Sequence, residues 1–415
     1  MSEMQDTYAP VINGRRVARV RGVTLSILLA VSLMWAPSLS RAQDSEPLVP
    51  TPGVDCQAPV VNETLASGPE TAPGICWSVD FSSFTTRPAV SGDTVFFGSA
   101  NSLSRPALFA LDATTGAERW NFELGERFFA SEPIVVGDRV FAGGPDGLYR
   151  LDAATGQRDW RFRVEPDEMG LPRSFMMPAH HDGRVYGVSG GIIGGILRAV
   201  DAETGEELWN LDEPETGFFA PVATDAGVLT VTYGGRLRLL DPATGEALWT
   251  VELGQQPPGP ATVIGDLAIA ATYEGAVAFD LATGAPDWTY TSETGATQVV
   301  AAGEQLLVVE EGSLAMLDPA DASEVWRAEF AVSPTPGLLG LTLPVVAGTT
   351  IYVVMSDGLE GTIVALDTAT GETRWSIGSA EGLLVTYLST PAAGGGRLYV
   401  GGFSFRGQAF SLGTT

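Results

Sequence analysis

Apolar and polar side chains alternate over short stretches along most of the chain. In residues 158–164, for example, Trp160 and Phe162 alternate with Arg161 and Arg163. A period of two is typical of a strand with one buried face. Gly-Asp and Pro-Asp-Gly segments between such stretches are typical of tight turns. No helical period is found beyond the N-terminal segment, so the chain is predicted to be all-β.

One ten-residue segment recurs seven times, with Asp at its second position and Trp at its end. The Asp residues are Asp112, Asp152, Asp201, Asp241, Asp280, Asp318 and Asp367. The Trp residues are Trp120, Trp160, Trp209, Trp249, Trp288, Trp326 and Trp375, and Trp77 precedes them all in a similar strand. Successive Trp residues are 38 to 49 positions apart. A period near 40 residues that holds four short strands is typical of a β-propeller blade.

The recurring segment has a structural explanation. An Asp side chain can accept hydrogen bonds from the amides that follow it, and Gly supplies the positive φ that such a turn needs. The Trp ring can pack between adjacent blades, and its N–H can bond to a neighbouring backbone. We therefore expect these residues to be structural rather than to bind calcium or a cofactor. In the sixth copy Asp321-Ala322 replaces Thr-Gly, so this turn is expected to differ from the others.

The ends of the chain predict how the ring closes. After Trp375 the chain continues with strands at 397–401 and 408–412, but no further Trp strand follows. At the other end, residues 77–81 form a Trp strand with no blade before it. We predict that this strand completes the last blade, giving a single eight-bladed propeller of four-stranded antiparallel sheets. Closure removes the free sheet edges that promote aggregation.

An export signal precedes the repeats. Residues 14–21 contain four Arg and no acid, an apolar run of 13 residues covers 23–35, and a small-residue site ends at Ala42. This order is typical of a cleaved signal peptide, and a run of 13 is too short to span a bilayer. We divide the chain into a signal peptide (1–42), a Pro-rich leader (43–74) and the propeller (75–415). The mature protein is expected to be periplasmic or extracellular, without a transmembrane span.

The two cysteines, Cys56 and Cys76, both follow the predicted signal peptide. In an oxidising compartment an even pair favours one disulfide, although two free thiols are the alternative. A disulfide here would close a loop of about 20 residues and stabilise the fold by ~3 kcal/mol. It would also attach the leader to the propeller.

Charge narrows the range of partners. The chain has 23 basic and 50 acidic residues, a formal net charge of −27. Such a balance argues against nucleic acid and against an anionic membrane surface as partners. We expect a monomer that binds another protein.

The segments that join one blade to the next are apolar for loops. They contain Phe128, Phe129, Phe175, Met176, Met177, Phe218 and Phe219. In a propeller these crossings lie on one face around the central channel, where contiguous apolar side chains often mark a binding site. These residues are our candidates for partner binding. The alternative is that they fold inward and close the channel.

The repeat, read as (L/F/V)-D-x-x-T-G-x-x-x-W, resembles that of the PQQ-binding-like β-propeller superfamily over residues 75–415. Its branches include the quinoprotein dehydrogenases and the BamB-like propellers of outer-membrane protein assembly. The quinoprotein branch implies adjacent cysteines beneath the cofactor, a catalytic Asp and a calcium site. Here Cys56 and Cys76 are far apart in sequence, so the resemblance implies the fold rather than the quinone chemistry.

We therefore predict a non-catalytic, exported scaffold that needs no cofactor and has no metal site or catalytic residue. The alternative is a dehydrogenase of alcohols or sugars, which would use PQQ with calcium. His180 and His181 do not change this prediction. Adjacent residues on a strand point to opposite faces and make a poor shared set of ligands.

Overall fold

The computed structural model describes residues 48, 50–56, 67–81, 84–100, 105–125, 130–167, 173–190, 194–330, 340–341, 343–356, 361–378, 383, 387–403 and 408–414. The chain divides into two compact units, residues 1–39 and 40–415, and every described residue lies in the second. The predicted signal peptide lies outside the described residues.

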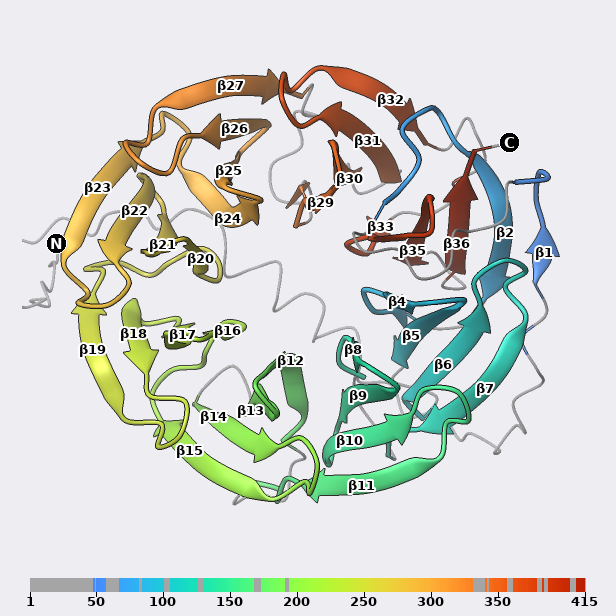
Figure 1. Ribbon diagram of the computed structural model, residues 1–415, viewed down its shortest axis with the longest axis horizontal. Coiled ribbons are helices and arrows are strands. Elements are labelled where there is room, and N and C mark those ends of the chain that lie inside the picture. The colour runs from blue at the N-terminus through green and yellow to red at the C-terminus, as the bar shows by residue number, and fades with distance from the viewer. Residues whose placement is uncertain are drawn as a thin grey trace, which may run out of the picture. The chain divides into compact units, whose positions relative to one another are not determined.

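The described residues of the second unit form a ring of eight antiparallel sheets (Figure 1). Blade 1 contains β4 (Ala89–Ser91), β5 (Thr94–Ala100), β6 (Ala107–Asp112) and β7 (Glu118–Glu123), with the short β3 (Phe84–Thr85). Blade 2 contains β8 (Ile134–Val136), β9 (Arg139–Gly144), β10 (Gly147–Asp152) and β11 (Arg158–Arg163). Blade 3 contains β12 (Phe175–His181), β13 (Arg184–Gly190), β14 (Gly195–Asp201) and β15 (Glu207–Glu213). Blade 4 contains β16 (Val222–Thr224), β17 (Gly227–Val231), β18 (Arg236–Leu240) and β19 (Ala247–Glu252).

The other half of the ring follows the same order from inner to outer strand. Blade 5 contains β20 (Thr262–Ile264), β21 (Leu267–Thr272), β22 (Gly275–Asp280) and β23 (Pro286–Thr291). Blade 6 contains β24 (Ala296–Ala302), β25 (Gln305–Glu310), β26 (Ser313–Leu317) and β27 (Glu324–Glu329). Blade 7 contains β29 (Val345–Ala347), β30 (Thr350–Ser356), β31 (Gly361–Asp367) and β32 (Thr373–Ile377), with β28 (Gly340–Leu341). Blade 8 contains β34 (Ala392–Gly394), β35 (Arg397–Phe403), β36 (Gln408–Gly413) and β2 (Gly74–Asp80), with β33 (Tyr387–Leu388) and β1 (Thr51–Pro52).

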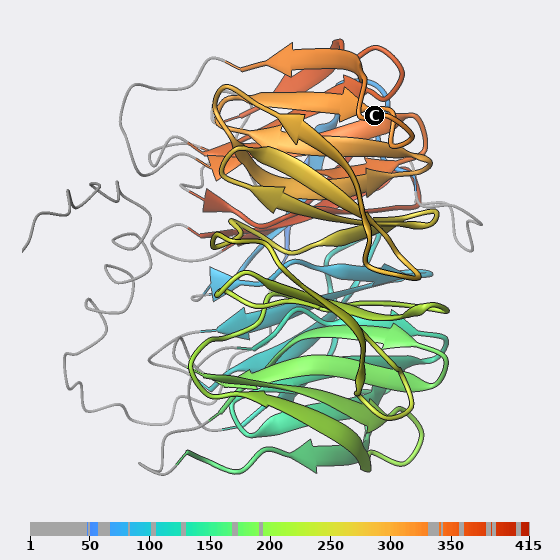
Figure 2. The same cartoon turned by 90° about the vertical axis from the view of Figure 1, so that its left-hand side faces the viewer.

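The ring closes through blade 8, where the N-terminal β2 pairs with the C-terminal β36 from Gly74 opposite Gly413 to Asp80 opposite Gln408. Seen edge-on, the strands of successive blades run across the thickness of the ring (Figure 2). No helix occurs among the described residues. The predictions of eight four-stranded blades, an all-β fold and closure by both chain ends are confirmed.

The core lies between the blades, and most joints are built from the recurring Asp, Gly and Trp. The Trp120 Nε1–H donates to the carbonyl of Ala153 in the next blade's turn at 3.0 Å, and Trp249 does the same to Leu281 at 2.8 Å. The ring also lies on the turn glycine. A Cβ on Gly156 would lie 2.6 Å from Cδ2 of Trp120. The turn thus needs Gly for its φ of +70° and for the room that the indole requires.

The joint between blades 2 and 3 departs from this arrangement. The Trp160 Nε1–H has no hydrogen-bond partner among the described residues. The corresponding carbonyl, that of Ala202, accepts from Nη1 of the buried Arg150 at 3.0 Å. At this joint an arginine therefore makes the contact that an indole makes elsewhere.

The turn of the sixth copy keeps the shape of the others, contrary to the expectation from Asp321-Ala322. The Asp318 amide donates to the Ser323 carbonyl and the Ala322 amide donates to the Asp318 carbonyl, both at 2.9 Å. The Asp321 carboxylate accepts from the Ser323 amide, a role that the Thr hydroxyl has in the other turns. Ala322 adopts a φ of +59°, so a side chain occupies the conformation that favours Gly.

The leader completes the joint between blades 7 and 8. Blade 8 has no turn between its third and fourth strands, because these are the two ends of the propeller chain. The Pro69 carbonyl takes the place of that turn, accepting from Trp375 Nε1 at 3.0 Å and from the Tyr352 hydroxyl at 3.2 Å. The leader therefore supplies the acceptor that the missing turn cannot provide.

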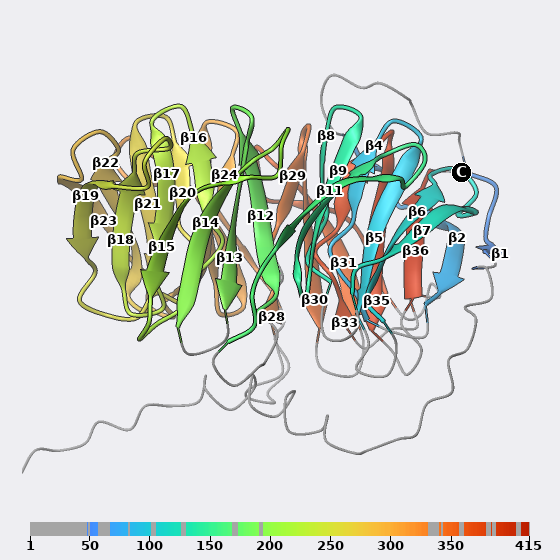
Figure 3. The ribbon, with the colours of Figure 1, turned by 90° about the horizontal axis from the view of Figure 1, so that it is seen from below.

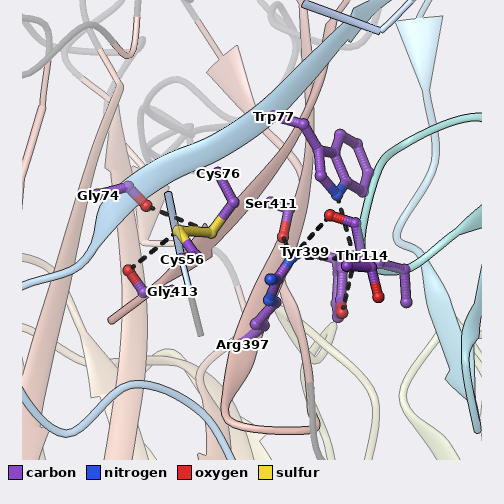
Figure 4. The surroundings of a disulfide bond; sticks show 10 residues. Cys56, Gly74, Cys76, Trp77, Thr114, Arg397, Tyr399, Ser411 and Gly413 are labelled. Carbon is purple, nitrogen blue, oxygen red and sulfur yellow. Dashed lines mark hydrogen bonds between the residues drawn. A yellow bond between two sulfur atoms is a disulfide. The ribbon is translucent and has the colours of Figure 1, made fainter. Parts of the chain in front are cut away.

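Two further contacts hold the leader on the outer side of blade 8. β1 adds to the outer edge of β2, with Thr51 opposite Ser78 (Figure 3). Cys56 and Cys76 form a disulfide, as predicted (Figure 4). The leader is therefore joined to β2 both covalently and by backbone pairing.

The joint between blades 8 and 1 converges on one carbonyl. Ala113 accepts hydrogen bonds from Trp77 Nε1 at 3.1 Å, from Nη1 of Arg397 at 3.2 Å and from the Tyr399 hydroxyl at 3.3 Å. Figure 4 shows the three donors pointing to the same turn. Arg397 is only 2% exposed, and burial lowers its pKa. Closure thus concentrates polar contacts where the two chain ends meet.

Adding a methyl group beneath an indole should weaken one joint. Gly371→Ala would force a φ of +71° on a side chain and place Cβ 2.4 Å from Cε3 of Trp326. We expect a loss of about 3 kcal/mol, since both strain and overpacking contribute. Gly137→Ala is the matched control, because its φ is +60° with open space around it, and it should lose only about 1 kcal/mol. Equal shifts in urea unfolding would contradict packing of the ring on the glycine.

The opposite change should stabilise the sixth turn. Ala322→Gly relieves a left-handed φ of +59°. After allowance for the larger entropy of unfolded Gly, we expect a gain of about 0.5–1 kcal/mol. Urea unfolding measures it, and a loss of stability would show that the alanine methyl group makes a favourable contact.

Breaking the disulfide should destabilise the closed ring. Cys56 and Cys76 are 20 residues apart, and cross-linking a loop of this length contributes about 3 kcal/mol. Cys56→Ser should therefore unfold at lower urea than the oxidised wild type. Dithiothreitol should lower the midpoint of the wild type to a similar value and leave that of the variant unchanged.

Candidate binding surface on the crossing face

The two faces of the ring are made by different connections. In a four-stranded antiparallel blade, the turn after the inner strand and the turn before the outer strand lie at one end. The crossing to the next blade leaves from the other end, beside the turn between the second and third strands. We call this second side the crossing face. It carries the segments that the sequence marks as apolar.

The structure separates the predicted binding residues into three groups. Phe128 and Phe129 lie outside the described residues. Phe175 and Phe218 are fully buried, with no exposed surface. Met176, Met177 and Phe219 are only partly buried.

The burial of Phe175 and Phe218 corrects their assignment to a partner site. Phe175 pairs with Ser189, and Phe218 forms a bridge to Thr232, so each belongs to the start of its blade's sheet. Phe175 packs with Phe141 and other side chains in the joint between blades 2 and 3, and Phe218 packs in the core around Trp209. These two phenylalanines therefore fold inward and cannot contact a partner.

Their neighbours keep part of their surface because successive side chains on a strand point to opposite sides. Phe219 packs edge-on against Tyr233, with the ring centroids 4.6 Å apart. The register of β12 shifts between Met176 and Ala179, and Met177 within this irregularity has a φ of +53°. A bulge that re-aims side chains is common beside functional sites. The two methionines thus lie on locally distorted backbone.

Sequence reasoning missed Phe84, which is 40% exposed in the crossing from blade 8 to blade 1. β3, which contains Phe84, pairs with β5. Phe84 lies seven positions before the last residue of its inner strand, as Phe129 does in the next blade. This shared spacing could have identified Phe84 as a member of the apolar crossings. We define the apolar arc as Phe84, Met176, Met177 and Phe219. The crossings into blades 5 and 6 instead carry polar segments such as Gln255-Gln256 and Ser292-Glu293-Thr294.

The two histidines lie on the inner strand β12 and contact different blades. The His180 ring stacks on Phe141 of blade 2 with the centroids 6.2 Å apart, and burial lowers its pKa. The His181 Nε2 lies 2.9 Å from a carboxylate oxygen of Asp225 in blade 4. The pair is therefore divided between two neighbours. Within the described ranges, no three His, Cys, Asp or Glu side chains are grouped so that they could hold a metal ion.

The recurring Asp side chains use Oδ1 within their own turns, and Oδ2 of Asp112, Asp152 and Asp367 pairs with an arginine on a strand of the same blade. Oδ1 of Asp152 accepts from the Thr155 hydroxyl at 2.8 Å and from the Thr155 amide at 2.9 Å, and these bonds lower its pKa. Burial alone would raise the pKa of Asp112, but hydrogen bonds from Arg119 and Thr115 bring it below its usual value. These contacts are those of a turn-forming side chain.

The comparisons with known proteins agree with this geometry. The sequence model of the family described as outer membrane protein assembly factor BamB matches residues 70–210, 193–337 and 274–413. The chain belongs to this family. BamB from Burkholderia pseudomallei is 28% identical over 269 residues, which cover 60% of this chain and 65% of that protein.

Other similarities are more limited. BamB from Moraxella catarrhalis, at 20% identity, superposes with a TM-score of 0.61 over 82% of this chain and 100% of that chain, which shows the fold alone. The quinohemoprotein alcohol dehydrogenase ADH-IIG of Pseudomonas putida is 29% identical over 100 residues, 22% of this chain and 14% of that protein. The chain spans less than two thirds of the length of the curated relatives it matches. In the described part of the chain, no helix has the length and apolar character needed to cross a membrane.

The turn carboxylates should make stability depend on pH. Folding lowers the pKa of Asp112 below its ordinary 3.8, so the stability it contributes is present above about pH 5 and is lost as pH falls through the folded pKa. Asp112→Asn should lower the urea midpoint at pH 7, and its difference from the wild type should shrink towards pH 2. The same difference at both pH values would show that the loss does not come from charge.

Proposed function

We propose that this propeller is a non-catalytic, exported scaffold of the cell envelope that binds a protein through the apolar arc. Membership of the BamB family supports an envelope role, and the printed name of the Burkholderia relative is outer membrane protein assembly factor. We extend that role to this chain as part of the proposal. Its partner would then be a protein of the outer-membrane assembly process.

The observation that carries the proposal is the partial exposure of the apolar arc. The chain is strongly acidic overall, yet Phe84, Met176, Met177 and Phe219 retain apolar surface on blades 1, 3 and 4 of the crossing face. Methionine and aromatic side chains suit adaptable protein contacts, because thioether chains are flexible and aromatic rings offer a large area. The lopsided placement of the arc favours one partner on one side of the mouth over a ligand centred in the channel.

Export is proposed on two independent features. Residues 1–42 have the pattern of a signal peptide, and Cys56 and Cys76 are joined in a disulfide. Structural disulfides persist in oxidising compartments such as the periplasm and are rare in the cytosol. Both features favour a protein that folds outside the cytoplasm.

An oxidoreductase using PQQ with calcium is the second candidate, favoured by the similarity to ADH-IIG. The residues present do not fit the cofactor site that this branch implies. The disulfide of this chain joins the leader to β2, the outer strand of blade 8, and holds the leader on the ring. Titration with PQQ and calcium tests the candidate directly. If the protein retained quinone absorbance and catalysed dye-linked oxidation of an alcohol or sugar, the scaffold proposal would be wrong and the oxidoreductase would be supported.

The scaffold proposal predicts that the apolar arc is needed for outer-membrane protein assembly. In a host deleted for this gene, folded outer-membrane β-barrel proteins should be depleted, and the wild-type gene should restore them. Met176→Ser/Met177→Ser/Phe219→Ser should restore them several-fold less well, because the arc loses its apolar area. The level of folded barrel is measured by its heat-modifiable migration in gels.

Leu208→Ser/Leu248→Ser is the matched control. These leucines are 44% and 54% exposed on the outer strands β15 and β19, away from the arc. This variant should restore assembly like the wild type and keep the wild-type urea midpoint. The arc variant should have a lower midpoint, because Phe219 packs on Tyr233, but should still unfold in one cooperative transition. Full restoration by the arc variant would contradict binding at the arc, and unchanged barrel levels in the deleted host would contradict a role in assembly.

A further inference from the structure

One outer strand differs in charge from the outer strands of the other blades. In β11, Arg158 stands two positions before Trp160 and Arg163 stands three positions after it. The corresponding positions hold two carboxylates in three other blades, and neither position holds a cation in the remaining four. The carboxylates are Glu118 and Glu123 in β7, Glu207 and Asp212 in β15, and Glu324 and Glu329 in β27. The edge of blade 2 is therefore basic in a chain whose net charge is −27.

The two arginines are available to a ligand. Arg158 and Arg163 are exposed, and neither forms an ion pair with a described residue. Arg161 between them is already engaged, since Nη1 lies 2.9 Å from an Asp146 carboxylate oxygen and the guanidinium lies 5.8 Å from the centre of the Tyr149 ring. Among the described residues, the strand thus presents two cations outside any ion pair beside one that is held in place.

A hollow of about 380 Å³ lies next to this strand, between blades 1 and 2. Its lining includes Phe122 and Tyr149, which pack edge-on with the ring centroids 5.5 Å apart, and Arg158 and Arg161. Arg105 also lines it and pairs with Glu123 at 2.7 Å. Glu123 and Asp146 also line the hollow and pair with Arg105 and Arg161, so Arg158 is the cation of the lining that is left for a carboxylate of a bound segment.

The backbone edge of β11 is open as well. β11 is the terminal strand in the order β11-β10-β9-β8, and no described strand pairs with its outer side. Blade 8 shows that an outer edge of this ring can accept an added strand. There β1 pairs with β2, and the Gly53 and Val54 amides donate to the Cys76 and Ile75 carbonyls at 2.9 and 2.8 Å. Figure 1 shows β1 outside β2 and the corresponding outer position of β11.

We infer that the outer edge of β11 binds an extended acidic segment of a partner protein as a fifth strand of blade 2. Backbone pairing to the edge provides the affinity, and carboxylates that alternate along the segment pair with Arg158 and Arg163. A long polyanion such as nucleic acid is disfavoured, because the acidic outer strands on either side would repel its extended charge. The site lies on a different surface from the apolar arc and does not depend on the function proposed for that arc.

The test measures binding of a short, fluorescently labelled peptide in which Glu alternates with Val. Its fluorescence anisotropy is followed as the purified oxidised protein is added. The wild type should bind the peptide saturably. Arg158→Gln/Arg163→Gln should weaken binding about tenfold, the combined effect of two exposed ion pairs. Thr250→Glu/Thr291→Glu on β19 and β23 lowers the net charge by the same two units and should leave the affinity within twofold.

Two further probes separate edge pairing from simple charge attraction. The same peptide with alternate backbone amides methylated keeps its charge but cannot pair along a strand edge, so its binding should be lost. A single-stranded oligonucleotide of equal charge should bind at least tenfold more weakly than the peptide. The inference is overturned by absent binding of the peptide to the wild type, by equal loss in both protein variants, by undiminished binding of the methylated peptide, or by equal binding of the oligonucleotide.

Discussion

The fold depends on the contact between the indole of one blade and the turn of the next. The indole lies flat on a turn glycine, as Trp326 does on Gly371, and in most joints its N–H donates to a carbonyl in the same turn. Each contact requires that the Asp turn has formed and that the next blade is in place. A blade therefore becomes stable only when its neighbour is present, which is the logic of repeat proteins. Closing the ring satisfies the last joint and leaves no terminal face uncovered.

The joints that depart from this pattern show what the contact requires. At the joint between blades 7 and 8 the turn is missing, and the Pro69 carbonyl replaces it. At the joint between blades 2 and 3, Arg150 takes the carbonyl in place of the indole of Trp160. In the sixth turn Ala322 adopts a positive φ without loss of the turn's hydrogen bonds. The need at each joint is for a donor, a carbonyl acceptor and a flat packing surface, and different residues can supply them.

The residues on the two faces of the ring differ in how far the fold constrains them. On the turn face, the Asp oxygens and the glycines are committed to the joints, so their chemistry is used by the fold. Fewer side chains of the crossings and the outer strands are needed for the contacts between blades. The two candidate binding surfaces lie there, namely the apolar arc of blades 1, 3 and 4 and the basic strand β11. Binding surfaces on a propeller can arise in these places without disturbing the joints.

The sequence by itself determined the all-β class, the eight blades, and the closure by Trp77 and the C-terminal strands, and it favoured a disulfide between the only two cysteines. These follow from local signals, namely the period of two, the Asp turn and the Trp spacing, which recur and therefore reinforce one another. Only the tertiary structure decided which residue of each apolar pair is exposed. Phe175 and Phe218 are buried while Met176 and Phe219 are partly exposed, because strand pairing and a bulge set the register of each crossing. The contact of Pro69 with Trp375 was also beyond the sequence, since it joins residues 306 positions apart that only the closed ring brings together.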